Sequence, residues 1–484
     1  MEHRLQILIV MITYLGLLIM WGIYQGRKVK NDSDYAIAGR KLPGWAAALS
    51  ERATGESSWA LLGLPGFAYA SGLASIWTAI GCLAGIITAW WGLAWRLRDE
   101  AEHFQINTFT QYIAKKHPEM GKWIRIIASS TLVFIFFFYV GAQFLGGGKT
   151  LHTMFEIDPK IGMLVTALII IPYTVYGGFR SVVYTDVIQA IVMIIALIIG
   201  PIIGIITIAT SPDIFANSIP AALSKAGAGH NSLSGAVSGF AAGTMIMGGL
   251  SWFFGYLGGM PQLSMRFMAI SDSDQAKKAR NIGIVWTIFA YIGALSIGWI
   301  GLALFGPQGL ADQEYVMPAV MMEIFPPAIA SILITGAIAA MISTADSLLI
   351  LSASELSENL LDNSKSSPIK NKLNRSRLVT AILAVVALAV AYFSSSNLIF
   401  ELVGYVWAGV GSTFSIVIMY SLFWKKYHGR AAIITILAGI VSWVIWIAAG
   451  LENIISSRIS VFIIAGLAGF LATLFIPKKE VKTL

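Results

Sequence analysis

The stretch Ser-Glu-Arg-Ala-Thr-Gly-Glu-Ser-Ser-Trp-Ala-Leu-Leu-Gly-Leu-Pro-Gly (residues 50–66) lies inside an otherwise apolar segment of membrane-spanning length. It carries three charged side chains, Glu51, Arg52 and Glu56, together with several hydroxyls and a central Gly55. Each charge in the hydrocarbon of a bilayer costs roughly several kcal/mol. Such groups persist only where they face a protein interior or a wet cavity. The stretch is therefore predicted to form half of a binding site in a transporter.

The composition indicates a polytopic membrane protein. Of 484 residues, 57% are hydrophobic and only 12% are charged, whereas soluble domains carry about 25% charged residues. The single cysteine, Cys82, excludes an intrachain disulfide and a cysteine-based metal cluster. The formal net charge of +8 fits the Lys and Arg that gather in cytoplasmic loops. We therefore expect no nucleic-acid partner.

Thirteen membrane-spanning helices are predicted, within one transporter domain over residues 1–484. The first apolar segment is followed by basic residues and by no small-residue cleavage site, so we expect a membrane helix rather than a signal peptide. The spans cover approximately residues 5–26, 43–70, 73–96, 126–149, 159–176, 182–210, 236–264, 281–306, 326–352, 378–395, 399–424, 431–450 and 458–476.

The distribution of basic residues predicts the orientation. With the N-terminus outside, 27 of the 33 Lys and Arg residues fall in inner loops and 5 fall outside. Arg52 is then the one basic residue left within a span. This asymmetry favours an outer N-terminus, and an odd number of spans places the C-terminus inside.

The second and seventh predicted spans suggest an internal symmetry. Both are long and interrupted by glycines, they lie five spans apart, and they run in opposite directions. Interrupted spans in corresponding positions of two inverted halves indicate a binding site near the bilayer midplane. Glycine is also frequent in closely packed membrane helices, which is the alternative explanation.

Residues 339–347, Ala-Ala-Met-Ile-Ser-Thr-Ala-Asp-Ser, place oxygen-bearing side chains within the ninth span. Ser343, Asp346 and Ser347 share one helix face by their spacing, and Thr344 adds a hydroxyl. Hard cations prefer such oxygen ligands. The hydroxyls could instead bond their own helix, but a buried Asp346 needs a cation, a proton or a basic partner. No GxxxxGK[ST] motif is present, so an ion gradient is the expected energy source.

Other candidate residues have two interpretations. Asp186 could be a charge at a helix N-terminus, favoured by the helix dipole, or a functional carboxylate. Arg52 and Glu56 could form an i,i+4 ion pair; alternatively Arg52 holds an anionic substrate group, or Glu56 binds a cation or proton. Further aromatic or polar side chains are expected to pack mainly in the core, with one to three lining a substrate cavity: Tyr139, Gln143, Trp252, Phe253, Tyr405 and Trp407.

Several motifs along nearly the whole chain resemble the sodium/solute symporter family, and within it the sodium/proline symporters. They are Tyr-Gly-Gly-Phe-Arg-Ser (176–181), Thr-Asp-Val-Ile-Gln-Ala (185–190), Pro-Gln-Leu-Ser-Met-Arg-Phe-Met-Ala (261–269), Ser-Thr-Ala-Asp-Ser (343–347) and Tyr-Val-Trp-Ala-Gly (405–409). The resemblance implies an all-α, leucine-transporter-type fold of two inverted five-helix repeats, residues 43–210 and 236–424. One extra helix, 5–26, would precede them and two more, 431–476, would follow.

The resemblance also implies site residues. A sodium site would use backbone oxygens of Ala53, Glu56 and Ala340 with the hydroxyls of Ser343 and Thr344. A second cation site, present in some members, would use Asp186, Ser343, Asp346 and Ser347. The substrate would lie between the broken second and seventh spans, near Thr54, Ser57, Ser58, Tyr139, Gln143 and Phe253. Arg52 is a further candidate because of its charge, independently of the resemblance.

Two differences from the proline carriers leave the identity of the substrate undetermined. Those carriers have Asp where this chain has Gly55, and Trp and Tyr where it has Phe253 and Leu257. Glu56 is one position further, about 100° around a helix. The ion-site residues match the family better than the substrate-site residues.

We therefore expect a multi-pass cell-membrane protein that performs sodium-coupled symport of a small polar organic solute, with an amino acid such as proline first. The alternatives are a proton- or sodium-coupled carrier of a small carboxylate or sugar acid, and a non-transporting solute sensor or channel. An enzyme is not expected, because no Ser/His or His-rich constellation is present. The expected partners are the substrate, Na⁺ and membrane lipid, with a monomer as the working expectation.

Overall fold

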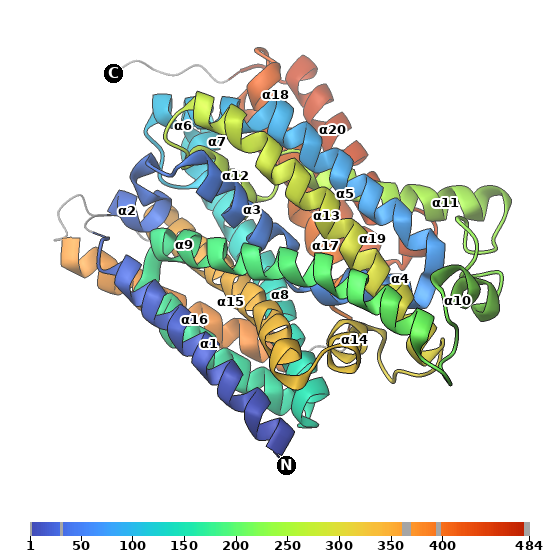
Figure 1. Ribbon diagram of the computed structural model, residues 1–484. Coiled ribbons are helices and arrows are strands. Elements are labelled where there is room, and N and C mark those ends of the chain that lie inside the picture. The colour runs from blue at the N-terminus through green and yellow to red at the C-terminus, as the bar shows by residue number, and fades with distance from the viewer. Residues whose placement is uncertain (1, 30–31, 361–368, 394–397, 479–484) are drawn as a thin grey trace.

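The computed structural model describes residues 2–29, 32–360, 369–393 and 398–478. The described residues form α-helices connected by short turns (Figure 1). The helices are α1 (Glu2–Gly26), α2 (Asp32–Ile37), α3 (Gly44–Ser58), α4 (Leu64–Ser71), α5 (Ile76–Thr88), α6 (Ala94–Phe104), α7 (Phe109–Lys116), α8 (Gly121–Phe155), α9 (Pro159–Thr210), α10 (Ile219–Ala226), α11 (Gly239–Leu250), α12 (Pro261–Met268), α13 (Ser273–Phe305), α14 (Val316–Ile324), α15 (Pro327–Glu355), α16 (Ile369–Phe393), α17 (Ile399–Val406), α18 (Thr413–Phe423), α19 (Gly429–Ala448) and α20 (Ser457–Phe475).

Ten helical stretches of the described residues are long and apolar enough to cross a membrane. One of them, Gly44–Phe104, contains two predicted spans, which are divided at Gly72, where φ is 58°. The span predicted at 159–176 is the shorter apolar helix Pro159–Pro172 within α9. The span predicted at 236–264 is interrupted, with α11 and α12 on either side of the interruption. The all-helical membrane architecture is thus confirmed, and the count of thirteen stays a prediction.

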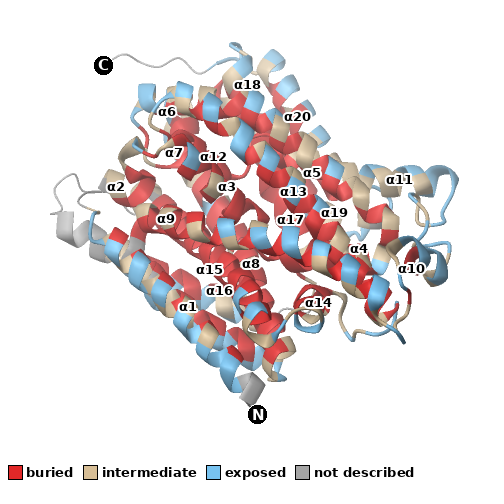
Figure 2. Cartoon of the chain, in the orientation of Figure 1, coloured by how far each residue is buried: buried red, intermediate tan, exposed pale blue. Residues whose placement is uncertain are grey.

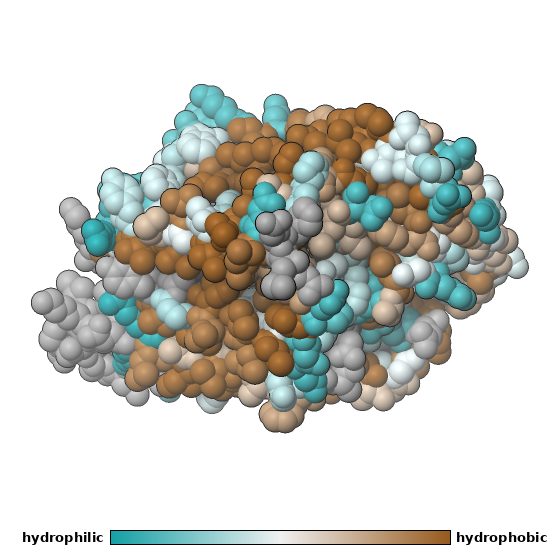
Figure 3. Space-filling model, turned by 60° about the horizontal axis from the view of Figure 1, so that its bottom comes forward, coloured by the Kyte–Doolittle hydropathy of each residue, from teal (hydrophilic) through white to brown (hydrophobic). Residues whose placement is uncertain are grey.

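The outer surface of the helix bundle is apolar. Large exposed hydrophobic side chains lie along α1, α9, α16, α19 and α20, and Figure 3 shows broad brown areas on one face of the molecule. Patches of this size are rare on soluble monomers, whereas lipid tails cover them without cost. The polar residues discussed below are instead buried, and Figure 2 shows in red that the buried residues occupy the interior of the bundle.

Helix α15 lies at the centre of the bundle. Helix α15 packs against α9, α8, α3 and α1. Its apolar window is 83% buried, whereas that of the peripheral α1 is 28% buried. Polar residues of α15 therefore face other helices rather than lipid, which is the arrangement that buried polar groups in a membrane require.

Two helical segments that border the interior are broken. Within α3, Ser57 has φ 42° and ψ −153°. Such backbone at a non-glycine residue costs about 1–3 kcal/mol and is typical of functional sites. A second break separates the 3-10 turn Ser251–Tyr256 from α12, and Gly258 within it has φ 82°. The interruption predicted near Gly55 is therefore present, but two residues later.

Close contact between α9 and α13 depends on Gly293. A Cβ atom at this position would overlap the carbonyl oxygen of Leu197, a backbone atom that cannot rotate away. Gly293→Ala should therefore force the two helices apart and destabilise the fold by about 1–3 kcal/mol or more. We expect a lower melting temperature for the purified variant. Gly16→Ala on α1, where a Cβ would meet no atom within 4 Å, is the control, and equal melting temperatures for both variants would contradict this packing.

Candidate cation and substrate site

The broken helix α3 and the central helix α15 meet at the hydroxyl of Thr344. This hydroxyl lies 3.1 Å from the carbonyl oxygen of Ala340 and 3.3 Å from that of Thr54. The hydroxyls of Thr54 and Ser347 are 3.4 Å apart. The structure thus brings together the two polar stretches that the sequence singled out. The α3 carbonyl that contacts Thr344 belongs to Thr54, which directly follows the predicted ligand Ala53 and precedes Glu56 by two positions.

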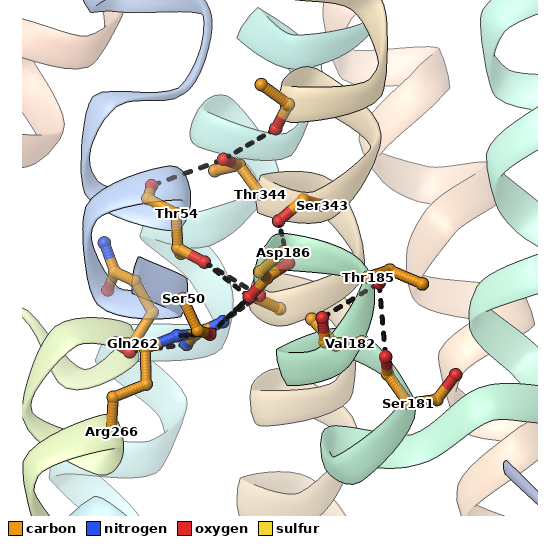
Figure 4. A network of polar contacts seen from close by, with 12 residues as sticks. Ser50, Thr54, Ser181, Val182, Thr185, Asp186, Gln262, Arg266, Ser343 and Thr344 are labelled. Atoms are coloured by element: carbon orange, nitrogen blue, oxygen red, sulfur yellow. Dashed lines mark hydrogen bonds and ion pairs between the residues drawn. The ribbon is translucent and has the colours of Figure 1, made fainter. Parts of the chain in front are cut away.

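Asp186 is the centre of the polar network drawn in Figure 4. Ser343 of α15 donates to its Oδ1. Ser50 and Thr54 of α3 and Arg266 of α12 all donate to Oδ2, Thr54 at 3.3 Å and Arg266 at 2.8 Å. Asp186 lies on α9 and is fully buried. One carboxylate therefore joins four helices, and Asp186 is more than a charge at a helix N-terminus.

Arg266 lies two residues beyond the span predicted at 236–264 and is therefore among the 27 basic residues assigned to inner loops, but this assignment is wrong. Its side chain is fully buried. Besides Asp186, it donates to the hydroxyls of Ser50, at 2.8 Å, and Ser347, at 2.7 Å, and to the Gln262 carbonyl at 2.7 Å. The span boundary was misplaced, because the chain leaves the helix after Tyr256 and α12 then returns to the interior. The family-type motif at 261–269, which contains Arg266, is the sequence feature that could have indicated a functional position for this residue.

Arg52 is also not the one basic residue inside the bundle. Arg458, at the start of α20, donates to the Ser251 hydroxyl at 2.8 Å, and its guanidinium lies over the Trp252 ring. Lys149 of α8 forms an ion pair with Glu314 at 2.6 Å. Each of these cations has a partner, which is the condition for burying a charge.

The residues predicted for a second cation site converge only in part. Asp186, Ser343 and Ser347 belong to the network around Arg266. Asp346 points to another part of α9, where Thr174 donates to its Oδ1. Its Oδ2 is buried and has no hydrogen-bond partner among the described residues. Asp346 is thus close to the network but does not share the contacts of Asp186.

Arg52 is paired within its own helix. It donates to Glu51 through Nε, at 2.6 Å, and to Glu56 through Nη1, at 2.9 Å. Thr287 and Tyr291 of α13 complete the cluster, and Tyr291 donates to Glu56 at 3.2 Å. All three charged side chains are buried. This placement supports the ion-pair interpretation and argues against Arg52 as a substrate anchor. Both contacts of Glu56 use Oε1, and its Oε2 is buried without a hydrogen-bond partner among the described residues.

The break in α3 faces helix α8. The hydroxyl of Ser57 lies 3.3 Å from that of Tyr139, and the backbone N–H of Ser58 donates to the side-chain oxygen of Gln143 at 3.2 Å. Four residues predicted to line a substrate site therefore lie together. Their hydroxyl and amide groups can hydrogen-bond a small polar solute. Thr54, predicted in the same group, faces Asp186 and Ser347 instead.

Aromatic rings border this group of polar residues. Trp252 stacks on Trp59, with ring centroids 4.9 Å apart, and lies 5.9 Å from Trp407. Phe253, the predicted lining residue, is only partly buried and packs edge-on against Phe254. The assignment of Phe253 to the substrate site stays a prediction, and its neighbour Trp252 is the fully buried residue of the two. The geometry of the 3-10 turn Ser251–Tyr256 determines which of these two adjacent side chains is buried.

The donor set around Thr344 suits sodium. Hydroxyl and carbonyl oxygens from α3 and α15 approach one another in a buried region, and a carboxylate lies one hydrogen bond away through Ser343. Hard cations bind such neutral and anionic oxygens. The arrangement offers no sulfur or imidazole ligand, and no cluster of three or more His, Cys, Asp or Glu residues suited to a metal ion occurs in the described part of the chain.

Comparisons with known proteins agree with this chemistry. A family model described as the sodium:solute symporter family matches residues 35–439. The high-affinity proline transporter PutP of Bacillus subtilis is 30% identical, over 94% of this chain and 95% of the relative. The osmoregulated proline transporter OpuE of the same organism is 30% identical, over 99% and 96%. Sodium/proline symporter 2 of Staphylococcus saprophyticus is 30% identical, over 91% and 86%.

Solved structures share the fold. A Na⁺-coupled sialic acid symporter, in a substrate-bound outward-open state, superimposes with a TM-score of 0.78 at 20% identity, covering 98% of this chain and 99% of the other. Mhp1, a nucleobase-cation-symport-1 family transporter in a closed conformation with bromovinylhydantoin bound, gives a TM-score of 0.56 at 14% identity, covering 91% and 95%. At these identities the likeness shows a common helical architecture.

Proposed function

The chain belongs to the sodium:solute symporter family, and from that premise we propose that it moves one small polar solute together with Na⁺ by alternating access. It is a multi-pass protein of the cell membrane. The main support for this mechanism is the contact of the Thr344 hydroxyl with the carbonyl oxygens of Thr54 and Ala340. This contact places oxygens of the broken helix α3 next to oxygens of the continuous helix α15.

The proposed sodium ligands are the backbone oxygens of Ala53, Glu56 and Ala340 and the hydroxyls of Ser343 and Thr344. Bound Na⁺ would supply the positive charge that draws these oxygens together. The residues themselves connect α3 to α15 on the two sides of the ion. Ordering α3 next to its break would favour solute binding there, and by linkage the solute would raise the affinity for Na⁺ equally.

The proposed solute site is the region where Ser57, Ser58, Tyr139 and Gln143 meet under the Trp252 ring. Proline is the first candidate, because the named relatives are proline transporters. A small carboxylate or sugar acid is the second. Since Arg52 is already paired with two carboxylates, an anionic group would rely on N–H and hydroxyl donors.

The proposed architecture has thirteen membrane helices in two inverted repeats, 43–210 and 236–424, with an outer N-terminus and an inner C-terminus. Breaks in the first helical segment of each repeat, at Ser57 and around Gly258, support it. In Figure 1, α1 begins and α20 ends on opposite sides of the bundle, which suits an odd number of crossings. A monomer is the proposed working unit.

Uptake by proteoliposomes under separated gradients tests this function. Purified protein would be reconstituted and offered labelled proline, with a solute library as competitors, under an imposed Na⁺ gradient or an imposed proton gradient. We expect accumulation with the Na⁺ gradient alone. Accumulation that follows the proton gradient without Na⁺ would establish proton coupling, and binding without accumulation would favour a sensor or channel.

Gln143 should control solute affinity. Its side-chain oxygen accepts the Ser58 N–H next to the break, so Gln143→Ala leaves that N–H unpaired and the break poorly positioned. Losing such a buried hydrogen bond costs about 1–3 kcal/mol. We expect the KM for solute to rise roughly tenfold or more. The control is Thr153→Ala on the same helix, whose hydroxyl bonds its own backbone, and an unchanged KM for Gln143→Ala would remove it from the site.

A further inference from the structure

The guanidinium of Arg266 lies against residues that the family resemblance assigns to a second cation. It donates to Asp186 and Ser347, two of the four residues expected to bind that cation, at 2.8 and 2.7 Å. Ser343, a third, donates to the same carboxylate. An arginine side chain has only donors, so the surrounding oxygens point at it as they would at a metal ion. Figure 4 shows Arg266 reaching Asp186 from α12.

The carboxylate of the proposed second site is already paired with a cation. Asp186 and Arg266 are both fully buried and form an ion pair, with 2.8 Å between Arg266 Nη2 and Asp186 Oδ2. A second Na⁺ beside Asp186 would place another positive charge in the low-dielectric interior, and burying a charge without a partner of its own is costly. The cluster of Arg52 lies against α13 and makes no hydrogen bond or ion pair with these groups among the described residues.

We propose that Arg266 is a tethered cation that takes the place of a second sodium ion, so that one Na⁺ binds to the protein in each transport cycle. This inference rests on the proposed function, since it assumes the sodium site at Thr344. It assigns Arg266 a positioning role: its guanidinium holds Asp186 and Ser347 on either side of one nitrogen atom and sets the number of ions that the site accepts.

Equilibrium binding of ²²Na⁺ to the purified full-length protein, without solute, counts the ions directly. We expect one Na⁺ per wild-type chain. Arg266→Gln removes the internal charge and should bind two, with a Hill coefficient that rises toward about two. Arg266→Lys keeps the charge and should bind one. The double variant Asp186→Asn/Arg266→Gln also removes the carboxylate that a second Na⁺ would need, so it should bind one.

Arg98→Gln is the matched control, since Arg98 is likewise a buried arginine but donates to the carbonyl of Ile270; it should bind one Na⁺. Two ions on the wild-type protein would overturn the inference, as would a single ion on a folded Arg266→Gln variant. No ion on the wild-type protein would contradict the proposed function instead. If Arg266→Gln fails to fold, the number of Na⁺ ions bound per wild-type chain still tests the inference, because one ion supports it and two overturn it.

Discussion

Replacing Thr344 with alanine is expected to raise the Na⁺ concentration for half-maximal uptake at least about tenfold, which corresponds to a loss of about 1.4 kcal/mol in ion binding. The Thr344 hydroxyl is the group that contacts α3 and α15 together, through the Thr54 and Ala340 carbonyls. Its removal takes away one proposed ligand and one of the contacts between the two helices. Transport should persist at high Na⁺, because the other oxygens remain.

Initial rates of labelled solute uptake, measured at constant ionic strength with choline replacing Na⁺, give this concentration. Ser343→Ala should shift it in the same direction, since Ser343 is the second proposed hydroxyl ligand. Thr335→Ala is the matched control on α15, because the Thr335 hydroxyl has no hydrogen-bond partner among the described residues. Unchanged sodium dependence in both Ser343→Ala and Thr344→Ala would rule out the proposed site.

Replacing Arg52 with glutamine is expected to destabilise the whole protein. The variant leaves Glu51 and Glu56 as two buried carboxylates without their cation, and breaking a buried ion pair in this way costs about 3–5 kcal/mol. Thermal unfolding of the purified variant should show a large fall in melting temperature, or the variant should fail to accumulate. Arg27→Gln, at an exposed arginine, should leave the melting temperature unchanged.

A rescue distinguishes the ion cluster from a substrate role. The triple variant Glu51→Gln/Arg52→Gln/Glu56→Gln removes all three charges, so it should recover most of the lost stability. If Arg52 anchored an anionic substrate, Arg52→Gln would stay as stable as the wild-type protein and lose only solute affinity. That result would contradict the pairing described above.

Polar residues in apolar spans made the main part of the site predictable. The stretch at 50–58 and the one at 343–347 carry charges and hydroxyls that lipid would not tolerate, so their meeting in the interior follows from elementary energetics. The contacts of Thr54, Ser343 and Thr344 agree with that reasoning. Asp186 was recognised as a candidate, although its role as a junction of four helices depends on contacts distant in sequence.

Other features depend on tertiary structure and could not be predicted. The break in α3 falls at Ser57 rather than at Gly55, because tertiary contacts rather than glycine's intrinsic freedom hold the strained backbone. Trp252 and Phe253 are adjacent and similar, and only the path of a 3-10 turn determines which one faces inward. Arg266 was misplaced because an interrupted span makes the hydrophobic boundary unreliable, since the chain re-enters the interior after the interruption.

The most direct test of the sodium site needs no knowledge of the solute. Purified protein would be heated in increasing NaCl at constant ionic strength, with choline and potassium chlorides as references. An ion that binds only the folded state raises stability by RT ln(1 + [L]/Kd). We predict that the melting temperature of the wild-type protein rises with Na⁺ alone and that the Ser343→Ala/Thr344→Ala variant shows no rise. A wild-type protein indifferent to Na⁺, or an equal rise in the variant, would contradict a sodium ion held between α3 and α15.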